Sequence, residues 1–124
     1  MRLFHGTSSD NAASIIKQGF SLDYLTKGSL GKAIYLSRDF DKCAEYGRHI
    51  LAVEVDEKCI LKDDFLSVST FTPSTESSHD YTFRSKFKEY TLSKGFKGLE
   101  LNEFNEIAIY DLSCILSVKI YAIK

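Results

Sequence analysis

The chain has 124 residues, of which 44% are hydrophobic, enough for one compact domain with its own core. Its 16 basic and 17 acidic residues nearly cancel, so no overall field favours nucleic acid or an anionic membrane as a partner. The cysteine count is 3, an odd number without a Cys-x-x-Cys pair. This pattern argues against a disulfide framework and a structural zinc site, and we expect no bound metal.

No apolar run approaches the roughly 20 residues of a membrane span, and the N-terminus lacks the apolar stretch of a signal peptide. We therefore expect a cytoplasmic protein that does not contact membranes. We also expect it to be a monomer. Export by a signal-independent machinery would leave no such trace and stays open.

Strands and helices alternate in the first half of the chain. The expected elements are a strand at 2–6, a helix from the capping residues 8–10 to Gly19, a loop at 21–32, a strand at 33–37, a short helix at 39–46 ending at Gly47, and a strand at 50–56. The last of these alternates apolar and polar residues, which is typical of a strand with one buried face, and we expect it inside the sheet.

Strands dominate the end of the chain. The expected elements are a polar, poorly ordered stretch at 63–78, a helix at 81–93 with Gly95 beyond its end, and strands at 98–101, 106–110 and 118–123. We find no repeat, so we expect a single domain over residues 1–124.

Strand geometry predicts where the most distinctive side chains point. Because alternate side chains of a strand face opposite ways, Tyr35 lies opposite its apolar neighbours and faces a cleft or solvent. The same alternation turns three residues of a later strand outward, namely Glu106, Ala108 and Tyr110. His5 precedes Gly6, where a missing side chain lets a ligand approach the backbone amide. We expect these positions to form the walls of a site.

Four motifs occur in the order typical of one enzyme family. They are His-Gly at 5–6, Gly-Lys-Ala-Ile-Tyr at 31–35, Lys-Cys-Ala-Glu-Tyr at 42–46, and Asn-Glu at 105–106 before a strand ending in Tyr-Asp at 110–111. The combination resembles the His-Tyr-Glu branch of ADP-ribosyltransferases, which includes diphtheria-toxin-like enzymes and the catalytic domains of poly(ADP-ribose) polymerases. The resemblance implies an α+β fold with a few short helices around a split, mostly antiparallel β-sheet that binds NAD in a cleft.

The resemblance also assigns residues to NAD binding. The implied set is His5, Gly6, Thr7, Tyr35, Cys43 and Tyr46. In such a site His5 hydrogen-bonds the adenosine ribose, and the Gly6 backbone pairs with the nicotinamide carboxamide. The rings of Tyr35 and Tyr46 sandwich the nicotinamide, an arrangement that an aromatic face favours for a cationic ring.

The implied catalytic residues are Glu106, His5 and Tyr35, with Glu106 in the leading role. Its carboxylate would oppose the positive charge that develops as the bond between nicotinamide and ribose breaks. Two departures from the family pattern matter. Cys43 stands where the polymerases have a serine that donates to the carboxamide, and a thiol is a weak donor. Phe104 stands where arginine-modifying relatives have a second glutamate.

The implied activity is transfer of ADP-ribose from NAD to a macromolecule with release of nicotinamide. A chain of this length lacks the accessory regions of the polymerases, so we expect transfer of a single unit. Phe104 makes an arginine acceptor less favoured and lies on the expected acceptor side of the site. We expect a protein acceptor rather than nucleic acid, because the basic residues between 84 and 97 fit the solvated face of an amphipathic helix.

Other functions stay open at this point. Water as the acceptor would make the protein an NAD glycohydrolase, and a non-catalytic module could bind NAD or ADP-ribose, although such a module needs no catalytic carboxylate. An NAD-dependent RNA 2′-phosphotransferase is disfavoured because no paired arginines are present to bind a phosphate. For Tyr46 the alternative to ligand stacking is that it packs its helix on the sheet.

Overall fold

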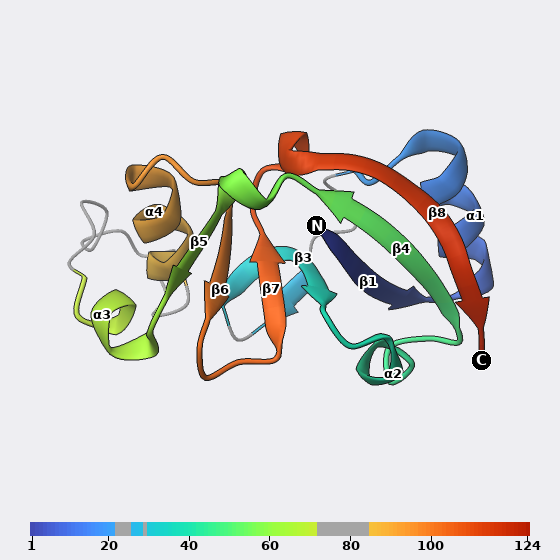
Figure 1. Ribbon diagram of the computed structural model, residues 1–124, viewed down its shortest axis with the longest axis horizontal. Coiled ribbons are helices and arrows are strands. Elements are labelled where there is room, and N and C mark those ends of the chain that lie inside the picture. Colours follow the sequence, from blue (N-terminus) through green and yellow to red (C-terminus); the bar gives the residue numbers. More distant parts are fainter. Residues whose placement is uncertain (22–25, 29, 72–84) are drawn as a thin grey trace.

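The computed structural model describes residues 1–21, 26–28, 30–71 and 85–124, and its core is one mostly antiparallel β-sheet (Figure 1). The strands lie in the order β5-β6-β7-β3-β1-β4-β8, with β2 paired to β3. Their bounds are β1 Arg2–Thr7, β2 Thr26–Gly28, β3 Gly31–Ser37, β4 His49–Val55, β5 Ile60–Asp63, β6 Gly98–Leu101, β7 Glu106–Ile109 and β8 Ile115–Ile123. The sheet and the short helices around it confirm the predicted α+β class.

The sheet is split between β1 and β3. These strands pair at Phe4 and Ser37, whereas β1 pairs with β4 along its whole length, from Arg2 to Thr7. Beyond Phe4 the two strands therefore diverge. One half of the sheet consists of β5, β6, β7 and β3, and the other consists of β1, β4 and β8.

Helices cover different parts of the two halves (Figure 1). Their bounds are α1 Ser9–Gln18, α2 Phe40–Cys43, α3 Phe65–Ser69 and α4 Ser85–Ser93, with 3₁₀ turns η2 at Glu57–Cys59 and η3 at Leu112–Cys114. Helix α1 packs on β4 and β8, α4 on β3 and β6, and α2 on β1 and β3 at the split. None of the described helices is long and apolar enough to cross a bilayer.

Local sequence explains the limits of α1, as predicted. The Ser8 side chain accepts a hydrogen bond from the Asn11 amide at 3.2 Å and so caps the first turn. Gly19 ends the helix with a φ of 79°, a conformation that glycine adopts without strain. Asp39 likewise caps α2 by accepting from the Asp41 amide at 2.9 Å.

Two hydrophobic cores lie on opposite faces of the β5–β3 half. The first core includes Leu3, Ile15, Ile34, Leu36, Leu51, Val53, Ile107 and Ile109. The second core consists of Leu30, Ala33, Val68, Phe87, Leu99, Leu101, Ala108 and Tyr110. Residues of α3 and α4 supply part of the second core and cover the face that was expected to be open. The prediction that Ala108 and Tyr110 point outward is therefore wrong, since they are 0% and 5% exposed.

Several element boundaries also differ from the expectation. Strand β2 occupies part of the expected loop at 21–32 and pairs with β3 from its first residues. Strand β5 was not predicted, because its edge position and its parallel partner β6 cannot be inferred from four residues. Helix α3 lies within the stretch 63–78 that was expected to be poorly ordered. Residues 72–78, and residues 81–84 of the expected helix at 81–93, lie outside the described residues.

Candidate active site

Tyr46 and Glu106 are brought together from distant parts of the chain. Glu106 is the first residue of β7, and Tyr46 lies in the turn between α2 and β4. The Tyr46 hydroxyl donates a hydrogen bond to Oε1 of Glu106. This bond, more than burial, raises the pKa of Tyr46 to about 12, so the hydroxyl stays protonated at neutral pH. Because Tyr46 is 65% exposed, it does not pack its helix on the sheet, and its ring is open to a planar ligand.

His5 joins β1 to β3 at the split. Its Nδ1 lies 3.2 Å from the carbonyl oxygen of Tyr35, which can only accept, so Nδ1 carries the proton. Burial lowers the pKa of His5 below the ordinary 6.5, against the smaller raising effect of that bond. The imidazole is therefore neutral at pH 7, and its Nε2 is a hydrogen-bond acceptor. The ring also meets Phe20 edge-on, with centroids 5.2 Å apart.

Two glycines allow the end of β1 to contact the segment that carries Tyr46. A Cβ on Gly6 would lie 1.8 Å from the carbonyl oxygen of Cys43, and a Cβ on Gly47 would lie 2.2 Å from that of Thr7. Both atoms belong to the backbone, so neither glycine tolerates a side chain without a shift of the chain. The space that a side chain of Gly6 would need is filled by the Cys43 carbonyl, and the approach of a ligand to the Gly6 amide stays a prediction.

Tyr35 lies on the predicted side of β3, opposite the first core, but it is only half open. Its ring packs against the second core. Its hydroxyl donates to the carbonyl of Gly31 and accepts from the amide of Leu30 at 3.1 Å. These bonds fix the ring at the edge of the second core. Tyr35 pairs with Ala108, and Ser37 pairs with Glu106, so the Tyr35 ring lies on the same face of the sheet as the Glu106 side chain.

The thiol of Cys43 points back toward β1. Its Sγ lies 3.2 Å from the carbonyl oxygen of Phe4 and 3.7 Å from that of Asp39. Burial, with smaller contributions from Glu106 and Asp39, raises the pKa of Cys43 to about 11, so the group is a neutral thiol at pH 7. Its hydrogen is directed to backbone oxygens of its own chain, which makes it a poor donor to a ligand.

Phe104 lies in the loop before Glu106 and borders the second core. Its ring packs on the second core and lies 6.0 Å from the ring of Phe65, centroid to centroid. The neighbouring Glu103 accepts from the Phe65 amide through both carboxylate oxygens, at 3.1 and 3.3 Å. The loop before Glu106 is therefore held against the start of α3.

Sequence reasoning missed Ser37 and the packing role of Gly47. Ser37 pairs in register with Glu106, and its hydroxyl lies 3.4 Å from the carbonyl oxygen of Asn105. A serine at the end of an expected strand carries no signal of this kind until the strand register is known. Gly47 was predicted only to end a helix, although a second glycine close to Cys43 is a cue for close backbone packing.

No curated protein matches the chain. The family model described as the poly(ADP-ribose) polymerase catalytic domain matches residues 1–60, a segment that includes His5, Tyr35 and Tyr46 but ends well before Glu106. This match supports ADP-ribosyltransferase activity in general, with NAD as the substrate that the family uses. The predicted similarity to poly(ADP-ribose) polymerases is confirmed over residues 1–60, where the protein is similar to their catalytic domain, whereas the assignment to the His-Tyr-Glu branch stays a prediction.

Proposed function

We propose that the protein is a mono-ADP-ribosyltransferase of the His-Tyr-Glu branch, which transfers one ADP-ribose from NAD to a macromolecular acceptor. The observation that carries the proposal is the hydrogen bond from Tyr46 to Glu106. It holds a carboxylate beside an exposed aromatic ring, so one group can stack on nicotinamide while the other faces the adjoining ribose.

In the proposed reaction the bond between nicotinamide and ribose C1 breaks, and nicotinamide leaves with the bonding electron pair. The acceptor then attacks C1 and releases a proton, so NAD⁺ and the acceptor yield the ADP-ribosylated acceptor, nicotinamide and H⁺. Glu106 opposes the positive charge that develops on the ribose. Only one of its carboxylate oxygens accepts from Tyr46, which leaves the second oxygen for a ribose hydroxyl.

The state of His5 supports its proposed contact with NAD. A neutral imidazole whose Nδ1 donates to the Tyr35 carbonyl presents Nε2 as an acceptor, which suits the hydroxyl of the adenosine ribose. The rings of Tyr35 and Tyr46 would lie on either side of nicotinamide. The Cys43 thiol donates its hydrogen bond to the Phe4 carbonyl and so adds little to recognition of the carboxamide.

The proposed acceptor is a protein side chain other than arginine. Phe104 packs on the second core, and the Glu103 carboxylate is used by the start of α3. Phe104 has no carboxylate that could bind a guanidinium beside Glu106, and that of Glu103 already accepts from the Phe65 amide.

The decisive experiment incubates the protein with NAD labelled in its adenosine part, together with a cell lysate split into nuclease-treated and protease-treated portions. We expect nicotinamide release and a labelled polypeptide of discrete mass that survives the nuclease and disappears with the protease. Label that the nuclease removes would replace the protein acceptor with nucleic acid. Nicotinamide release without any labelled macromolecule would make the protein a glycohydrolase, and a ladder of products would contradict single transfer.

A further inference from the structure

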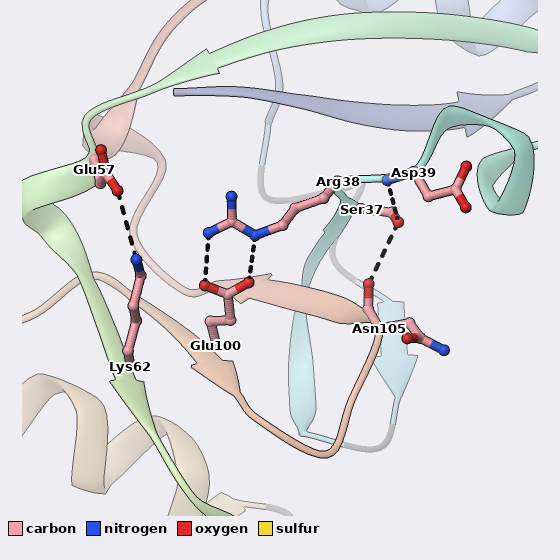
Figure 2. Close-up of polar contacts among 7 residues, drawn as sticks. All are labelled: Ser37, Arg38, Asp39, Glu57, Lys62, Glu100 and Asn105. Atoms are coloured by element: carbon pink, nitrogen blue, oxygen red, sulfur yellow. Dashed lines mark hydrogen bonds and ion pairs between the residues drawn. The ribbon is translucent and has the colours of Figure 1, made fainter.

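The hairpin that carries Glu106 is tied to residues 37–39 on one face of the sheet by a serine. Ser37 pairs in register with Glu106, and its hydroxyl donates to the carbonyl of Asn105 at 3.4 Å while accepting from the Asp39 amide at 3.1 Å (Figure 2). Asp39 then caps α2, which leads to Tyr46. This chain of contacts links the Tyr46 segment to the residue before Glu106.

An ion pair ties residues 37–39 to the β6–β7 hairpin on the opposite face of the sheet. The Arg38 guanidinium donates to both carboxylate oxygens of Glu100, at 2.7 Å from Nε and 2.8 Å from Nη2 (Figure 2). Strand β7 lies between β3 and β6, so a bond from the end of β3 to Glu100 on β6 spans β7. Glu100 pairs with Ile107, which belongs to the first core, and so lies on the face opposite Glu106.

The Arg38–Glu100 pair is stronger than an ordinary surface ion pair. The Glu100 side chain is only 17% exposed, and the bidentate geometry uses the planar fork of the guanidinium. Its hydrogen bonds with Arg38 lower the pKa of Glu100, and the nearby charge of Lys62 acts in the same direction. Lys62 in turn lies 3.5 Å from Glu57 (Figure 2), and the charge of Glu57 makes a small contribution to raising the pKa of Arg38. The pair therefore stays charged through the neutral pH range.

We propose that Arg38 is a positioning residue for Glu106. Its bidentate ion pair with Glu100, here called the clasp, reaches across β7 and holds the start of β7 where Glu106 accepts the hydrogen bond from the Tyr46 hydroxyl. The inference rests on the proposed function and extends it to a residue that touches neither NAD nor Glu106. A two-point clasp restricts sliding of β6 and β7 past the end of β3, which a single-point contact does not. Reactive geometry is sensitive to such sliding, since misplacement by about 1 Å can cost about a hundredfold in rate.

The test compares Arg38→Gln, Glu100→Gln and the double variant with Arg2→Gln as a matched control. Arg2 donates from its Nε to Glu54 at 3.1 Å and is 47% exposed, close to the 50% of Arg38, but its ion pair joins β1 to β4. Nicotinamide release is measured over a range of NAD concentrations, which separates kcat from KM, and thermal unfolding is recorded for every variant.

We expect Arg38→Gln and Glu100→Gln each to lower kcat by about tenfold or more with KM changed less than twofold. The double variant falls no further than either single one, because both remove the same clasp. Arg38→Lys restores only part of kcat, since an ammonium cannot make the two-point bond. A kcat for Arg38→Gln within twofold of Arg2→Gln, or equal losses in kcat and in NAD affinity, would overturn the inference.

A second readout does not depend on turnover. Tyr46 has a pKa of about 12 because it donates to Glu106. If the clasp positions Glu106, the pKa of Tyr46 in Arg38→Gln falls toward the ordinary value of 10, as measured by the pH dependence of its Cζ carbon-13 signal and assigned with Tyr46→Phe. An unchanged pKa of Tyr46 overturns the inference. Wild-type protein that releases no nicotinamide refutes the proposed function instead, and this titration still decides the role of Arg38.

Discussion

The hydroxyl of Tyr46 donates a hydrogen bond to the carboxylate of Glu106, although the two residues are 60 positions apart. The contact joins the turn after α2 to the first residue of β7, on either side of the split in the sheet. The roles of the two residues can be tested separately, because Tyr46 offers both a ring and a hydroxyl, whereas Glu106 offers only its charge and hydrogen-bonding oxygens.

Replacing Glu106 with glutamine is expected to lower turnover by about 10²–10³ while NAD binding changes little. Glutamine keeps the shape and an accepting oxygen for Tyr46 but removes the charge that opposes the developing cation. Nicotinamide release and calorimetry with NAD measure the two effects. Glu103→Gln is the matched control, because its carboxylate faces the Phe65 amide, and its turnover should stay near wild type. Equal turnover in wild type and Glu106→Gln would refute the assigned mechanism.

Two substitutions at Tyr46 separate its ring from its hydroxyl. Tyr46→Phe keeps the stacking surface, so the KM for NAD should stay within about twofold while kcat falls by about tenfold. Tyr46→Ala removes the ring and should mainly weaken NAD binding, which calorimetry measures. If Tyr46→Phe lost affinity as strongly as Tyr46→Ala, the hydroxyl would contact NAD itself rather than serve Glu106.

The raised pKa of Tyr46 predicts a stability effect at high pH. Tyr46 binds its proton more tightly in the folded protein, since its pKa is about 12 instead of 10. The resulting stabilisation is complete below the unfolded value of 10 and is lost as pH rises through about 12. Urea unfolding of wild type and Tyr46→Phe at pH 8 and pH 11 measures this effect. The stability difference between the two proteins should be smaller at pH 11 than at pH 8, and a difference that does not shrink would contradict the raised pKa of Tyr46.

The lowered pKa of His5 predicts how NAD affinity depends on pH. Since burial keeps His5 neutral below 6.5, affinity should stay constant from pH 8 to pH 6.5 and fall only at lower pH. Because the pKa of His5 is lower in the folded protein, the unfolded chain binds this proton at a higher pH than the folded chain does. His5 therefore contributes stability above pH 6.5 that is lost as pH falls through its folded pKa. Carbon-13 titration of the imidazole and calorimetry with NAD test this, and His5 titrating at or above 6.5 would contradict the lowering of its pKa by burial.

Gly6→Ala is expected to cost about 2–4 kcal/mol of stability, because the new methyl group would overlap the Cys43 carbonyl and force the backbone apart. Gly95→Ala is the control. Gly95 has a φ of 85° but open space around its Cα, so alanine there costs only about 1–2 kcal/mol of strain. Chemical denaturation measures both variants. A smaller loss for Gly6→Ala than for Gly95→Ala would show that β1 and the Tyr46 segment are not in tight contact.

The residues of the candidate site could be named from the sequence, but their contacts could not. His5, Tyr35, Tyr46 and Glu106 stand in motifs that resemble one family, and the family match covers the first three. No motif indicates that the Tyr46 hydroxyl donates to Glu106, or that Phe104 turns to the second core, because both depend on how the turn after α2 and the β6–β7 hairpin pack.

By itself the sequence determined the elements whose signals are local. Helix α1 begins at the Ser8 cap and ends at Gly19, and β6 occupies its predicted residues, because caps and side-chain alternation act within a few positions along the chain. Tertiary structure decided which faces are buried and which strands are neighbours. Burial of Tyr110 depends on the cover from α3 and α4, and the Arg38–Glu100 clasp exists only because β7 lies between β3 and β6. A single strand carries no information about its neighbours, so these relationships arise only when distant segments pack together.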